Sequence, residues 1–120
     1  MEAALIVHFG GAIPGKEKLA IETFAETTKL YERMLKDGTF TYFEPFLYKT
    51  GDIQEHLGFW LVKGPEDKLM HFMDSTESKE LAARAGQICN HLRIEFLYVG
   101  EGVREQILIR TKLAKDYVTV

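Results

Sequence analysis

The feature of this sequence that most constrains its fold is the order in which short apolar runs alternate with amphipathic stretches. Four runs have the length and the aliphatic, aromatic or β-branched composition of strands, at residues 3–9, 39–49, 57–63 and 92–99. Apolar side chains recur at helical spacing over residues 16–36, from Pro65 to Cys89, and from Val103 to Ala114. The expected order is therefore strand, helix, strand, strand, helix, strand, helix.

Turn-forming residues separate these segments. The pair Asp37-Gly38 is expected to end the first helix, and Thr50-Gly51-Asp52 to separate the second and third strands. Pro65 suits the first position of a helix, because its missing N–H would have no partner there. Ser75 is a good N-cap, so the helical region 65–89 is expected to break near Asp74-Ser75.

This order predicts an α+β, ferredoxin-like βαββαβ fold. Its four strands would form one antiparallel sheet with helices on one face, followed by a C-terminal helix. The chain has 120 residues, which is the length of one domain, and contains neither a repeat nor a linker-like stretch. Residues 1–120 are therefore expected to form a single domain.

Composition argues against several classes of protein. Fifteen Lys and Arg against eighteen Asp and Glu leave no basic surplus for a phosphate backbone, so nucleic acid is not an expected partner. No run approaches 18 apolar residues and no basic flank precedes the first apolar run, so neither a membrane span nor a signal peptide is expected. The single Cys89 excludes an intramolecular disulfide and favours a reducing, cytoplasmic location.

Both faces of the expected sheet are apolar. We assign the more aliphatic set of each strand to the helix side, which places Leu57, Phe59 and Leu61 there in the third strand. The other, open face would then collect Ile6, His8, Tyr42, Glu44, Phe46, Trp60, Val62, Arg93, Glu95 and Leu97. An exposed patch of this size marks an interaction surface, and a second copy packed sheet to sheet would cover it.

In its element order, its length and its aromatic-rich open face, the chain resembles the dimeric α/β-barrel superfamily. That group includes antibiotic-biosynthesis-type monooxygenases and stress-responsive barrel proteins. The resemblance spans nearly the whole chain and is architectural, since no catalytic motif matches residue by residue. It implies a homodimer whose two sheets form a barrel with small, often aromatic, ligands inside. It also implies that the terminal helix, from Val103 to Tyr117, adds to the dimer contact.

His8 and Glu44 are the candidate catalytic residues. If both point into the barrel, the carboxylate would orient the imidazole and produce a base that works near neutral pH. The alternative is that His8 ends its strand near solvent and that Glu44 solvates a bend before Pro45.

Tyr42, Trp60, Arg93 and Glu95 are the candidate ligand-binding residues. Tyr42 and Trp60 would stack on a planar ligand, unless they are ordinary core residues. Arg93 would hold a ligand carboxylate or phenolate with two hydrogen bonds. Alternatively, Arg93 and Glu95 form only an ion pair at the sheet edge or the dimer interface.

Two further patterns are not expected to be sites. The segment GGAIPGKE at residues 10–17 nearly spells a phosphate loop, but Glu17 stands where a hydroxyl would hold magnesium, so a tight turn at a pocket mouth is the better account. His56, His71 and His91 lie in different segments and form no closed set of metal ligands. No metal or cofactor is expected, and a haem-dependent enzyme of the same architecture remains an alternative without a sequence signal.

We therefore expect a homodimer that binds a small hydrophobic or aromatic molecule. If it is an enzyme, the expected chemistry is cofactor-independent oxygenation or isomerisation of an aromatic or polyketide-like substrate. The alternative is a non-catalytic, ligand-sensing or structural dimer, in which Trp60, Phe46 and Tyr48 would pack the interior shut.

Overall fold

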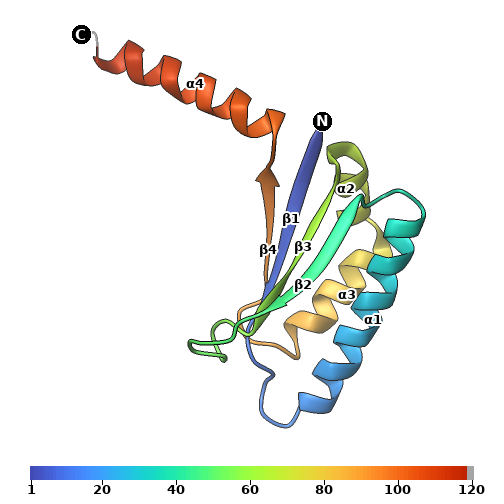
Figure 1. Cartoon of the computed structure of the whole chain (residues 1–120). Helices are drawn as coiled ribbons and strands as arrows, with labels where there is room; N and C mark the ends of the chain where they lie inside the picture. The colour runs from blue at the N-terminus through green and yellow to red at the C-terminus, as the bar shows by residue number, and fades with distance from the viewer. Residues whose placement is uncertain (119–120) are drawn as a thin grey trace.

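The computed structural model describes residues 1–118, which form one sheet with helices on one of its faces (Figure 1). The elements in order are β1 Glu2–Phe9, α1 Glu17–Lys36, β2 Tyr42–Leu47, β3 Gly58–Pro65, α2 Glu66–Met73, α3 Thr76–Gly86, β4 Arg93–Tyr98 and α4 Glu101–Val118. The predicted order is thus confirmed, although β2 is shorter than the run that predicted it.

The sheet has the order β2-β3-β1-β4, and every neighbouring pair is antiparallel. Helices α1 and α3 lie against one face (Figure 1). The two central strands, β1 and β3, come from opposite halves of the βαββαβ unit, so the sheet ties the two halves together. The ferredoxin-like α+β fold predicted from the sequence is confirmed.

The predicted facing of the third strand is wrong. In the register of β1 with β3, Leu5 lies opposite Val62 and Val7 lies opposite Trp60. Trp60 and Val62 are buried beneath the helices, whereas the alternating set with Phe59 lies on the open face. Side chains alternate with a period of two, so an error of one residue exchanges the two sets completely. Both sets of β3 are apolar, and composition therefore gave no basis for choosing between them.

Local signals set the ends of the helices as expected, with one difference. The Ser75 side chain accepts a hydrogen bond from the Ser78 N–H and caps α3, which confirms the break between α2 and α3. Gly38 follows α1 with a φ of +85°, a conformation that glycine adopts without a steric penalty. Pro65 ends β3 and precedes the first residue of α2, instead of occupying the first helical position.

The core between the helices and the sheet is built around aromatic rings. Tyr31 of α1 meets Phe40, Trp60 and Phe72 edge to face, with ring centroids 5.3, 5.1 and 6.3 Å apart. Edge-to-face pairs add about 1 kcal/mol each beyond the area they bury. These contacts join α1, α2 and β3 into one packed unit.

Helix α4 leaves the end of β4 and points away from the helix layer (Figure 1). The radius of gyration of 17.2 Å exceeds the roughly 14 Å of a compact chain of this length because of this projection. Its exposed apolar side chains are Val103, Ile107, Leu108, Ile109 and Leu113. The side chains of residues 116–120, including Tyr117 of the predicted dimer contact, lie outside those that the structure describes.

Three loops meet at the opposite end of the sheet through backbone hydrogen bonds of two glycines. Gly10 N–H donates to Asn90 O over 2.7 Å, Gly11 N–H donates to Gln54 O over 3.1 Å, and Asn90 N–H donates to Gly11 O over 2.9 Å. A Cβ atom at Gly10 would collide with the carbonyl oxygens of Gln54 and Asn90. The absence of a side chain therefore permits this junction.

We expect Gly10→Ala to lower the free energy of unfolding by about 1–3 kcal/mol, because two backbone segments must separate. Urea unfolding followed by circular dichroism measures this change. Gly86→Ala is the matched control, since its Cβ would lie 3.7 Å from the Leu92 side chain, an ordinary contact. Equal unfolding midpoints for the two variants would contradict the role given to Gly10.

Candidate functional site

A cavity of about 240 Å³ lies between the sheet and the helix layer. Its walls include Val7 and Phe9 of β1, Trp60 of β3, and Phe24 and Tyr31 of α1. The loops at the glycine junction also contribute, through Gly10 and Ala12. The pocket expected from the sequence was instead on the open face, between the sheets of two chains.

The lining of this cavity carries no Asp, Glu, Lys, Arg or His side chain among the residues that the structure describes. Its polar side chains are Thr23, Thr27, Tyr31, Trp60, Ser78 and Cys89. The Thr27 hydroxyl is already used, because it donates to Thr23 O within α1. Such an environment accepts neutral, mostly apolar groups and penalises an isolated charge heavily.

Trp60 is a buried residue in the wall of this cavity. It is 3% exposed, stacks on Phe24 with ring centroids 4.8 Å apart, and meets Tyr31 edge to face. The sequence predicted Trp60 as a ligand-binding residue on the open face. It instead lies on the helix side of the sheet, where it packs against core residues and lines the cavity.

The two ionisable groups of the cavity are held in their neutral forms. Burial raises the pKa of the Tyr31 hydroxyl far above its ordinary value, because the phenolate would lose its hydration. Burial also raises the pKa of the Cys89 thiol. Neither group is therefore an effective nucleophile or base at neutral pH.

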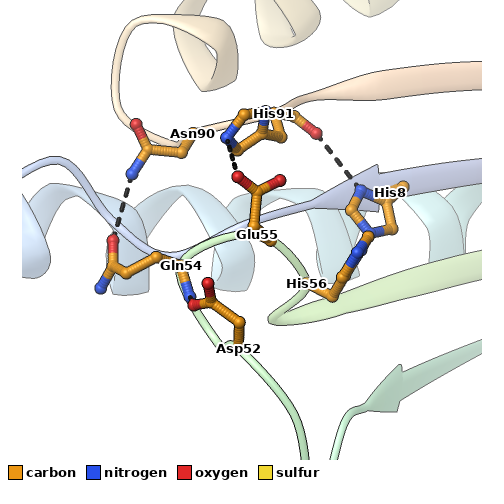
Figure 2. Close-up of polar contacts among 7 residues, drawn as sticks. All are labelled: His8, Asp52, Gln54, Glu55, His56, Asn90 and His91. Atoms are coloured by element: carbon orange, nitrogen blue, oxygen red, sulfur yellow. Dashed lines mark hydrogen bonds and ion pairs between the residues drawn. The ribbon is translucent and has the colours of Figure 1, made fainter.

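On the open face, the end of β1 carries a cluster of histidines (Figure 2). His8 is 3% exposed and both of its ring nitrogens have partners. Its Nδ1 lies 3.2 Å from the His91 carbonyl oxygen, and its Nε2 lies 2.9 Å from Nδ1 of His56. His8 therefore does not end its strand in solvent.

These contacts fix the tautomers of the two neutral rings. A carbonyl oxygen only accepts, so His8 Nδ1 carries a hydrogen and its Nε2 has a lone pair. His56 must then donate from its own Nδ1, which leaves a lone pair on His56 Nε2. His56 is exposed, so a buried imidazole orients an exposed one that can accept a proton.

The same loops are joined by side-chain contacts around this pair (Figure 2). His91 Nε2 lies 3.1 Å from a Glu55 carboxylate oxygen, and Asn90 Nδ2 donates to Gln54 Oε1 over 3.1 Å. His91 has a positive φ of 53°, which is unusual for a residue with a Cβ. The β2–β3 loop is thereby held against the α3–β4 loop.

Glu44 does not join His8. The Tyr42 hydroxyl donates to the Glu44 carboxylate, and this hydrogen bond raises the pKa of Tyr42. Glu44 and His8 share the open face but lie two strands and two residues apart, which places their Cα atoms roughly 12 Å from each other. Both ring nitrogens of His8 are taken by the His91 carbonyl oxygen and by His56, so Glu44 does not orient this imidazole.

Arg93 and Glu95 both lie on the open face of the edge strand β4. Arg93 pairs with His8 and Glu95 pairs with Ile6 in the register of β1 with β4. Arg93 Nε lies 3.8 Å from a Glu95 carboxylate oxygen, and both side chains are more than half exposed. An exposed pair of this kind contributes little to stability, so both side chains stay available for contacts across the open face.

The glycine-rich turn has the structural role expected of it and does not form a phosphate cradle. The N–H groups of Gly10, Gly11 and Ile13 already donate to backbone carbonyls. The Lys16 ammonium donates to Gln87 O. These are the groups with which a phosphate loop would hold its ligand.

Sequence reasoning did not identify Tyr31, His56 and His91 as parts of a site. Tyr31 has helical spacing typical of a core residue, and no local signal distinguishes it from one. His56 and His91 lie in separate loops, and only the closure of the sheet brings them to His8.

Among the side chains that the structure describes, those of residues 1–115, no group of three or more His, Cys, Asp or Glu is arranged to hold a metal ion. None of the helices described is long and apolar enough to cross a membrane.

Comparison with known proteins supports the fold. No family model matches the chain, and no curated protein matches it. Among solved structures, it is similar to a dimeric protein of unknown function and ferredoxin-like fold from Bacteroides fragilis, with a TM-score of 0.56 and 15% sequence identity. The match covers 82% of this chain and 96% of that one, so the two proteins share the ferredoxin-like architecture over most of their length.

Proposed function

We propose that this protein binds a small, uncharged, hydrophobic or aromatic molecule in the cavity between its sheet and its helices, and that it acts as a homodimer. The observation that carries the proposal is the cavity itself, about 240 Å³ lined by aromatic and aliphatic side chains without a charge. Binding sites for small molecules are typically concave and apolar, with a few polar groups that orient the ligand.

A binding role is favoured over catalysis inside the cavity. The raised pKa values of Tyr31 and Cys89 leave no group there that ionises readily at neutral pH. We therefore favour a ligand-sensing or carrier function over a cofactor-independent oxygenase or isomerase at this position. The single, half-buried Cys89 is consistent with a cytoplasmic location as part of the same proposal.

Two uncovered apolar surfaces support the homodimer. On the open face, Phe46 and Tyr48 are 37% and 42% exposed, and Phe46 stacks on Phe59. Helix α4 presents a second exposed apolar surface beyond the sheet. The similar structure from Bacteroides fragilis is described as dimeric. A second copy would cover both surfaces.

A second candidate function follows from the hydrogen-bonded pair of His8 and His56, here called the histidine pair. In a dimer closed over the open face, the free Nε2 of His56 would act as a general base, with His8 as its positioning residue. Tyr42, Glu44, Arg93 and Glu95 would line the space between the two sheets. This site would support the isomerase or oxygenase chemistry that the cavity does not favour.

Filling the cavity tests the first proposal. We expect Ala82→Leu, on the cavity wall of α3, to abolish binding of neutral aromatic molecules because the added carbons occupy the ligand's volume. Trp60 is the only tryptophan and Cys89 the only cysteine, and both line the cavity, so Trp60 fluorescence and the alkylation rate of Cys89 report binding directly.

Ala83→Leu is the matched control, because Ala83 is exposed on the same helix and does not line the cavity. It should bind as the wild type does. If Ala82→Leu kept the wild-type affinity, the ligand would lie elsewhere.

The homodimer is tested by placing a charge at the centre of the open face. We expect Leu61→Lys to weaken dimerisation more than tenfold, since a second sheet packed over the open face would remove the water around the ammonium, a cost that pairing with Glu44 does not offset. Leu61 of β3 lies opposite Glu44 of β2. The new lysine therefore has an oppositely charged cross-strand neighbour in the monomer. Light scattering should give the 13.7 kDa of one chain for this variant.

Leu19→Lys, at an exposed position of α1, is the control and should remain dimeric. A monomeric wild-type protein would rule out the dimer.

The histidine pair predicts an observable tautomer. At pH 8, long-range ¹H–¹⁵N spectra should show His8 and His56 both protonated at Nδ1, because each must donate from that atom. The exposed His71 of α2 provides an internal reference. A His8 ring protonated at Nε2 would exclude the orientation that makes His56 Nε2 a base.

A further inference from the structure

We infer that the ligand of the cavity is a neutral bicyclic molecule of about ten non-hydrogen atoms with one oxygen acceptor, such as a ketone oxygen, that pairs with the Tyr31 hydroxyl and the Trp60 indole N–H. This inference rests on the proposed function and specifies the chemical class that the cavity selects.

Two buried donors lining the cavity have no hydrogen-bonding partner among the described residues. Among the side chains of residues 1–115, no nitrogen or oxygen that is sealed from solvent lacks a hydrogen bond. Yet neither the Tyr31 hydroxyl nor the Trp60 indole nitrogen forms a hydrogen bond with a described residue, although the two residues are only 5% and 3% exposed. Each polar atom must therefore keep some open surface. Both residues line the cavity, and Tyr31 also borders a smaller one of about 60 Å³.

The chemistry of these groups selects an acceptor. An indole N–H only donates, and a neutral phenol hydroxyl donates as well as accepts. Burial keeps Tyr31 neutral, so it retains its hydrogen. The two rings meet at 5.1 Å between centroids. A single ligand oxygen near their common wall would satisfy groups that have no partner among the described residues.

The size and charge of the ligand follow from the cavity. An apolar protein cavity of about 150 Å³ holds benzene, with six non-hydrogen atoms. By the same ratio, 240 Å³ holds about ten, the size of two fused rings. A carboxylate or ammonium would find no opposite charge among the lining residues, so an ionic ligand is disfavoured.

Three ligands with a common skeleton test this inference: 1-tetralone, tetralin and tetralin-1-carboxylate. The first is a neutral ketone, the second lacks the oxygen, and the third is an anion. Because the chain has one tryptophan, ¹H–¹⁵N spectra contain a single indole N–H signal, and its position during a titration reports the contact with Trp60. Calorimetry supplies the dissociation constants.

We expect tetralone to bind about tenfold more tightly than tetralin, the effect of one net hydrogen bond to a buried group. The carboxylate should show no binding. Tyr31→Phe should reduce the affinity for tetralone severalfold and leave that for tetralin unchanged. Its melting temperature should equal or exceed that of the wild type, because the lost hydroxyl has no partner among the residues that the structure describes. Tyr98→Phe, at an exposed tyrosine of β4 outside the cavity, is the matched control and should behave as the wild type.

The possible failures are distinguishable. Equal affinities of the wild type for tetralone and tetralin would overturn the inference and leave the proposed function standing, and this comparison needs no variant. Preference for the carboxylate would overturn the neutral class. If none of the three ligands moved the indole signal or slowed alkylation of Cys89, both the inference and the binding function would fail.

Discussion

The pairing of β1 with β3 is the constraint on which the rest of the structure depends. These central strands come from the two halves of the chain, and their register places Val7 opposite Trp60 and Leu5 opposite Val62. A slip of one residue would turn Trp60 toward the open face and remove the ring on which Phe24 and Tyr31 pack. The aromatic core, the cavity beside it and the composition of the open face all follow from this single register.

The cavity illustrates how stability and function diverge within one core. A close-packed interior would be more stable without empty volume and without unpaired donors. Both occur next to the Trp60 ring, while the sealed polar side-chain atoms of residues 1–115 are all hydrogen-bonded. Such a local departure from good packing is typical of a site that a ligand completes.

Prediction from sequence succeeded where the signal was local. Ser75 caps a helix through its own side chain, and Gly38 supplies a positive φ, so the break between α2 and α3 and the end of α1 were readable from neighbouring residues. The candidate site was less predictable. The pairing of His8 with Glu44 fails because it required a separation between strands that no local pattern contains, although both side chains lie on the open face as expected. His56, the actual partner, lies 48 positions from His8.

The sequence by itself determined the order of the elements, their turns and the presence of apolar residues on both faces of the sheet, because hydrophobic period and turn chemistry are properties of short segments. Only the tertiary structure decided that Trp60 faces the helices and that His8 meets His56 and His91. The physical reason is that the facing of a strand apolar on both sides depends on its register with a distant strand. A cluster built from separate loops likewise exists only once the sheet has brought their ends together.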